Sequence, residues 1–99
     1  MTSIEIQKAI TDYIDKTGYT QAKDWYIGIA TDAKERLFSD HNVSEQNGKW
    51  GYYPANSEQT ARDAESSLLD KYPSFQGGTG GGISPSYVYA YYITADTVE

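Results

Sequence analysis

The sequence predicts a small α/β (α+β) fold in one domain, residues 1–99, with elements in the order α-β-α-β-α-β around a three-stranded sheet. Three observations support this prediction. Two segments repeat apolar residues at helical spacing, and three others are rich in aromatic and β-branched residues. The length of 99 residues suits a single hydrophobic core, and neither an internal repeat nor a long linker divides the chain.

The first expected helix carries both its start and its stop signal. Thr2 and Glu5 occupy the positions of a capping box, and Gly18 follows the helix as a stop. Between them, apolar residues recur with the period of a helix: Ile6, Ile10, Tyr13 and Ile14. The pattern indicates an amphipathic helix of about four turns.

Two further helices follow from capping residues and from proline. Thr31 or Asp32 can cap a second helix, which we expect to run to about His41. A third helix ends near Tyr72, because Pro73 cannot continue it. Its start is expected at residues 56–57, where an Asn-Ser pair precedes Gln59 in a second capping-box pattern.

Three strands complete the predicted fold. Residues 24–30 indicate a strand buried on both faces, and Gly28 within it suggests the close approach of another group. A short second strand is closed by Pro54. After a "GGTGGG" loop at 77–82, the last strand alternates between two sets of side chains, Val88, Ala90 and Tyr92 on one side and Tyr87, Tyr89 and Tyr91 on the other.

Composition narrows the class of protein. The chain has no cysteine, so a disulfide framework is excluded, and we expect a cytoplasmic location. No apolar run approaches the roughly 20 residues of a membrane span, so we expect no membrane partner. The net charge of -6 disfavours nucleic acid as a general partner, because phosphate binding depends on positive charge.

Glu65 is the most informative residue of the third helix. It occupies a position of the apolar stripe, where a carboxylate is normally paired with a cation, protonated or bound to a metal. One interpretation therefore places it at the edge of the stripe, beside an arginine or lysine. The other interpretation makes Glu65 part of a functional site.

Three other residues have both a structural and a functional interpretation. Arg36 is either a solvated helix residue or a bidentate ligand for phosphate or carboxylate. His41, the only histidine, is either a polar cap at a helix end or a group that exchanges protons. Tyr26 either packs in the core or offers its hydroxyl as an acid or base.

Taken together, these residues resemble the GIY-YIG nuclease family. The shared features are the "WYIG" segment with Tyr26, then Arg36 and His41, and then Glu65 on a later helix, within residues 24–72. The family's first motif, "GIY", is missing upstream, the histidine follows the arginine by five residues instead of four, and no asparagine follows Glu65. A permuted arrangement would let the C-terminal strand fill the missing position, with Tyr87 or Tyr89 supplying the ring.

The resemblance implies a mainly antiparallel sheet flanked by helices and a metal-dependent endonuclease activity on DNA. By this analogy Glu65 would hold one Mg²⁺ or Mn²⁺ ion, and Arg36 would bind the phosphate. Tyr26 and His41 would position or deprotonate the attacking water. The alternative is an inactive GIY-YIG-like acidic protein that binds another protein through its negative surface. We expect all four side chains to converge on one face of the sheet.

Overall fold

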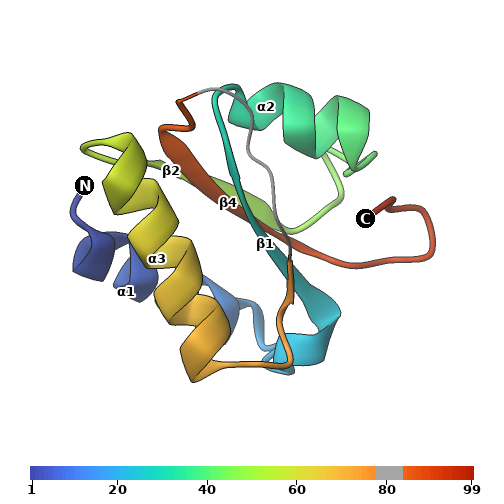
Figure 1. Ribbon diagram of the computed structural model, residues 1–99. Coiled ribbons are helices and arrows are strands. Elements are labelled where there is room, and N and C mark those ends of the chain that lie inside the picture. Colours follow the sequence, from blue (N-terminus) through green and yellow to red (C-terminus); the bar gives the residue numbers. More distant parts are fainter. Residues whose placement is uncertain (78–83) are drawn as a thin grey trace.

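The computed structural model describes residues 1–77 and 84–99. Figure 1 shows a central sheet with helices on both of its faces. The helices and strands, in chain order, are α1 (Ser3–Thr17), the 3-10 turn η1 (Ala22–Asp24), β1 (Trp25–Ala30), α2 (Ala33–Glu35), its π-helical continuation η2 (Arg36–Asp40), β2 (Trp50–Pro54), α3 (Glu58–Lys71), β3 (Gln76–Gly77) and β4 (Tyr87–Tyr92).

The sheet has four strands in the order β2-β4-β1-β3, so the expectation of three strands was wrong. β4 pairs antiparallel with both β1 and β2, whereas β3 pairs parallel with β1 and makes the sheet mixed. The additional strand is only Gln76 and Gly77, which carry none of the β-branched or aromatic residues that indicate strands. The C-terminal strand β4 pairs within the main sheet, as expected, and it lies between β2 and β1.

Helices α1 and α3 cover one face of the sheet and form the larger core. α1 contributes three buried isoleucines, and α3 contributes Ala61, Ala64 and Leu68. The strand residues of this core are Trp25, Ile27, Ile29, Val88 and Ala90. The capping box of Thr2 and Glu5 and the left-handed Gly18 that ends α1 are both confirmed.

A second, smaller core lies on the opposite face. Its buried residues come from β1, β4, α2–η2 and the segment that follows: Ala30, Ala33, Leu37, Val43, Tyr89 and Tyr91. The two sets of side chains predicted for the last strand are therefore divided between two cores, because successive side chains of a strand point to opposite faces.

The second helix starts as an α-helix and ends as a π-helix. The side chain of Asp32, rather than that of Thr31, caps it by accepting a hydrogen bond from the backbone N–H of Glu35 at 3.1 Å. At the other end the N–H of His41 donates to the carbonyl of Arg36 at 2.9 Å, a five-residue spacing that widens the last turn. Such π-turns are frequent at functional sites.

The third helix begins after Ser57, whose side chain accepts a hydrogen bond from the N–H of Thr60 at 3.1 Å. Gln59 does not complete a capping box, since its side-chain amide donates to Asp63 at 2.8 Å. Of the predicted glycine loop, Gly77 belongs to β3 and 78–82 lie outside the described residues. Within the described ranges, no helix is long and apolar enough to cross a membrane.

Removing β4 tests its central position. Deletion of residues 86–99 leaves β1 and β2 without their shared neighbour, and we expect cooperative thermal unfolding to be lost. Deletion of 94–99 is the control, because it keeps every β4 pair and should retain a sharp transition. A sharp transition near the normal temperature in the larger deletion would contradict the prediction.

Candidate functional site

His41 lies buried at the centre of a cluster of aromatic rings. Its side chain is 5% exposed, and both ring nitrogens are engaged. Nδ1 lies 2.7 Å from the carbonyl oxygen of Val98 and 3.0 Å from the hydroxyl of Tyr91, and Nε2 lies 2.8 Å from the hydroxyl of Tyr89. His41 is therefore more than a polar cap at a helix end.

These contacts determine which nitrogen of His41 carries the proton. A backbone carbonyl can only accept, so the contact with Val98 requires a proton on Nδ1. Burial is the main cause that lowers the pKa of His41, although the bond to Val98 opposes it. The ring is therefore neutral at pH 7, and its bare Nε2 accepts a hydrogen bond from Tyr89.

The absence of a side chain at Gly28 allows the ring of Tyr89 to lie directly over the backbone of β1. The two residues are direct partners in the β1–β4 register, and a Cβ built on Gly28 would lie 2.4 Å from Cζ of Tyr89. Any larger residue would displace the ring. The close approach expected at Gly28 is thus confirmed, and it brings the Tyr89 hydroxyl to His41.

Tyr26 stacks on the rings that hold His41. Its ring is nearly parallel to those of Tyr89 and Tyr91, at centroid distances of 6.2 Å and 5.1 Å, and it lies 4.7 Å from the ring of His41. Tyr26 is partly exposed, and its hydroxyl forms no hydrogen bond with the described residues. Of this group of rings, Tyr26 is the one whose hydroxyl is available to a ligand.

Arg36 lies within electrostatic reach of the cluster. Its guanidinium pairs with Asp40 at 3.4 Å, and both side chains are substantially exposed. Such a pair contributes at most about 1 kcal/mol, so Arg36 can exchange it for another anion. Its charge lowers the pKa values of Tyr26 and Tyr89 in opposition to burial, which is the main cause that raises them.

Glu65 reaches the cluster from the other side of the sheet. Leu69 packs on Gly77 of β3, since a Cβ there would lie 3.2 Å from its side chain. Glu65 is one turn earlier on α3, the helix that packs against β1. Consistent with this position, its charge adds to the effect of burial in raising the pKa of Tyr26 and of Tyr89.

Glu65 has no cationic partner among the described residues. Arg62, the nearest candidate in sequence, pairs with Glu58 at 2.9 Å, and Arg36 pairs with Asp40. Burial raises the pKa of Glu65 from 4.5 to about 7, and the charge of Arg62 offsets only part of this effect. The interpretation of Glu65 as half of a structural ion pair is therefore not supported.

The four predicted site residues do not share one face, so that expectation was wrong. Tyr26, Arg36 and His41 lie on the face covered by α2 and η2, whereas Glu65 belongs to a helix on the opposite face. Glu65 is linked to Tyr26 only electrostatically, through the effect of its charge on the pKa of that hydroxyl. His41 also differs from the prediction, because both of its nitrogens are occupied within the protein.

Tyr91 was missed by the sequence analysis, and Tyr89 was named only as one of two candidates for a ring. The alternation of the last strand placed both on one face together with Tyr87. It did not distinguish them, because three identical side chains repeat every second residue. The register opposite Gly28 would have favoured Tyr89, had the pairing of the two strands been known.

No described group of three or more His, Cys, Asp or Glu side chains is arranged to hold a metal ion. Glu65 is half-buried and forms no ion pair with the described residues, so it is a carboxylate that could contribute to holding a metal. Comparison with known protein families, curated proteins and solved structures finds no match to this chain.

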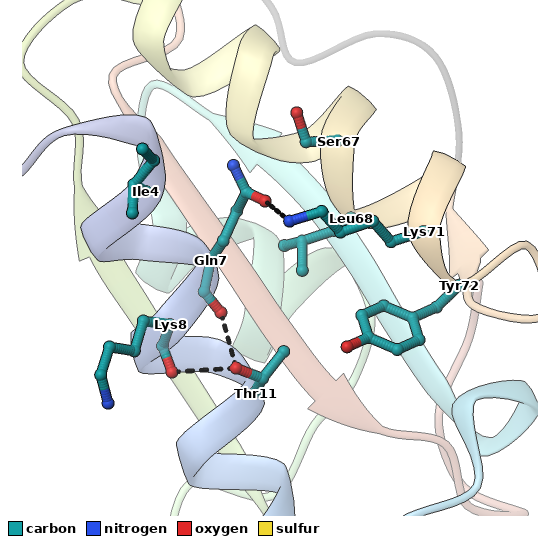
Figure 2. A pocket seen from close by; sticks show the side chains of 8 residues that line it. All are labelled: Ile4, Gln7, Lys8, Thr11, Ser67, Leu68, Lys71 and Tyr72. Carbon is teal, nitrogen blue, oxygen red and sulfur yellow. Dashed lines mark hydrogen bonds between the residues drawn. The ribbon is translucent and has the colours of Figure 1, made fainter.

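A separate groove of about 300 Å³ lies between α1 and α3. Figure 2 shows Lys71 reaching across it to donate a hydrogen bond to Gln7, at 3.1 Å. Ile4 and Tyr72, which also line the groove, are two of the large apolar side chains that are exposed to solvent. The groove therefore combines apolar surface with a lysine that has no acidic partner among the described residues.

Substituting Gly28 tests the packing of the aromatic cluster. Gly28→Ala forces the buried ring of Tyr89 to move, and we expect a loss of about 1 to 3 kcal/mol in the free energy of unfolding, measured by urea denaturation. Gly51→Ala is the matched control, because its Cβ would also approach a tyrosine, at 2.7 Å from the hydroxyl and 3.1 Å from Cζ of Tyr53, but that ring is less buried and can move at a lower cost. Equal losses in the two variants would contradict this account.

Substituting Glu65 tests its lack of a partner. Because its folded pKa is raised, Glu65 favours folding most below pH 4.5, and this contribution is lost as the pH rises through about 7. The neutral Glu65→Gln should therefore match wild type near pH 4.5 and exceed its stability by roughly 1 to 2 kcal/mol at pH 8, less than the full pKa shift corresponds to, because solvent screens this partly exposed carboxylate. Thermal melts across this range provide the measurement; a variant that is less stable at every pH would instead reveal a hidden cation partner.

Proposed function

We propose that this chain is a metal-dependent phosphodiesterase domain, of the endonuclease type, that acts on DNA. The observation that carries the proposal is Glu65, a half-buried carboxylate that no described cation neutralises. A protein tolerates such a group at a cost to stability, which is common where a residue has a functional role. Binding of a cation would remove that cost.

The donor set at Glu65 suits magnesium or manganese. Magnesium is commonly held by one or two carboxylates, with water and substrate phosphate completing its shell, so a single carboxylate is sufficient. The partial exposure of Glu65 leaves room for those other ligands. When bound, the metal would polarise the phosphodiester and lower the pKa of a coordinated water.

The remaining residues have roles that follow from their contacts. Arg36 can exchange Asp40 for a non-bridging phosphate oxygen, which a planar guanidinium binds with two donors. Tyr26 remains protonated because burial raises its pKa, and its hydroxyl can accept a hydrogen bond from the attacking water. His41 and Tyr89 do not touch the substrate; their rings pack against the ring of Tyr26 and hold it in place.

The likeness to the GIY-YIG family supports this proposal through one further feature. The antiparallel pairing of β4 with β1 puts a tyrosine-bearing strand next to the "WYIG" strand. This is the position in which a permuted chain would carry the missing first motif. Tyr89, rather than Tyr87, would supply the ring, since Tyr89 contacts His41.

A second candidate is a non-catalytic protein that binds another protein. The groove between α1 and α3 favours it, because Ile4 and Tyr72 expose apolar surface beside Lys71. The net charge of -6 also favours it, since it opposes general binding to nucleic acid. This candidate requires neither metal binding nor cleavage.

Plasmid cleavage and thermal melts, each with and without Mg²⁺ or Mn²⁺, separate the two candidates. We expect wild type to cleave only with metal, and its melting temperature to rise, because saturating metal stabilises the folded state by about 3 kcal/mol at a hundredfold excess over Kd. Glu65→Gln should lose both effects. Asp70→Asn, which changes an exposed carboxylate of the same helix that takes part in none of the described ion pairs, is the matched control and should keep both.

Absence of cleavage together with an unchanged melting temperature in wild type would refute the enzymatic proposal. The protein-binding candidate would then remain. A melting temperature that rises equally in wild type and Glu65→Gln would instead show that the metal binds at a site other than Glu65.

A further inference from the structure

The segment that follows β4 folds back over the end of η2 and contacts His41. Figure 1 shows this segment turning back toward the helix after the last strand. Residues 94–97 form a tight turn, in which the side chain of Thr97 accepts a hydrogen bond from the N–H of Thr94 at 3.0 Å and donates to its carbonyl at 3.0 Å. Residues 94–98 are called the strap below.

Backbone hydrogen bonds, rather than side-chain burial, attach the strap. The N–H of Val98 donates to the carbonyl of His41 at 2.8 Å, and the carbonyl of Val98 accepts from Nδ1 of the same residue at 2.7 Å. The side chain of Val98 is 57% exposed and contributes little to this attachment. A further bond runs from the side-chain amide of Asn42 to the carbonyl of Asp96, at 3.0 Å.

The attachment of the strap determines whether Nε2 of His41 accepts a hydrogen bond from Tyr89 or donates one to it. A neutral imidazole carries its proton on one nitrogen, and the hydrogen bond of that nitrogen fixes the choice. With the Val98 carbonyl at Nδ1, Nε2 must accept, so Tyr89 donates to it. Without the strap the proton can move to Nε2, which would then donate to the Tyr89 hydroxyl, so that Tyr89 would change from donor to acceptor and direct its own proton elsewhere.

We propose that the strap is a positioning device, in which the Val98 carbonyl fixes the tautomer of His41 and thereby holds the ring of Tyr89 on which Tyr26 stacks. This inference rests on the proposed function only for its effect on cleavage. Its structural part concerns one histidine and can be measured without any substrate. Val98 would be a positioning residue, because it touches neither substrate nor metal.

Nitrogen NMR of ¹⁵N-histidine-labelled protein at pH 8 tests the tautomer, and the single histidine makes the assignment unambiguous. Wild type should show a protonated Nδ1 and a bare Nε2. Val98→Pro removes the N–H that donates to His41, and the Nε2-protonated form should appear. Val98→Ala keeps the backbone bonds and loses only exposed surface, so it should match wild type.

Asn42→Gly provides a second perturbation in case the proline variant fails to fold. It removes the amide bond to Asp96, and glycine suits the left-handed backbone at position 42, where φ is 54°. The Nε2-protonated form should again appear, to a smaller extent. A protonated Nε2 in wild type, or an unchanged spectrum in the folded variants, would overturn the proposal.

Cleavage kinetics test the positioning role. Val98→Pro should lower kcat by roughly 10- to 100-fold, the usual effect of disturbing a group that orients a functional histidine, with KM unchanged. Val98→Ala should cleave as wild type does. A changed tautomer with normal kcat would overturn the positioning role. Absence of cleavage in wild type would refute the proposed function, and the NMR comparison would still decide whether the strap fixes the tautomer.

Discussion

The pairing of β4 with both β1 and β2 is the constraint on which the rest of the structure depends. Successive β4 side chains point to opposite faces. The register therefore places Val88 and Ala90 in the core under α1 and α3, and Tyr89 in the aromatic cluster on the other face. A slip of one residue would exchange the two sets and place large phenol rings in the core under α1 and α3. The same register sets Tyr89 opposite Gly28, where its ring fits and its hydroxyl reaches His41.

Local signals in the sequence were sufficient for the helices and for the long strands. The capping box at Thr2, the left-handed Gly18 and the alternation of the last strand each depend on neighbours within a few residues, and each is confirmed. β3 could not be predicted in the same way, because it is two residues long and its pairing with β1 depends on tertiary position. The widening of η2 also lacks a local signal in the sequence.

The candidate site was predictable only as a set of residue types. The apolar stripe identified Glu65, but its lack of a partner depends on how the arginines pair. Arg62 stands three residues before Glu65 and four after Glu58, and it pairs with Glu58. For His41, the sequence could not foresee burial by Tyr91 and Val98, which lie 50 and 57 residues away in the chain. Contacts of this range are established by the fold as a whole.

The environment of the candidate site disfavours the charged forms of both Glu65 and His41. Burial raises the pKa of Glu65 to about 7 and lowers that of His41 below 6.5. As the pH falls below 6.5, the unfolded chain protonates His41 more readily, so folding loses stability, while protonation of Glu65 restores it. The two effects on stability therefore oppose each other as the pH falls below 6.5. Above pH 7 only the Glu65 charge remains uncompensated, and a bound cation is the ligand that would compensate it.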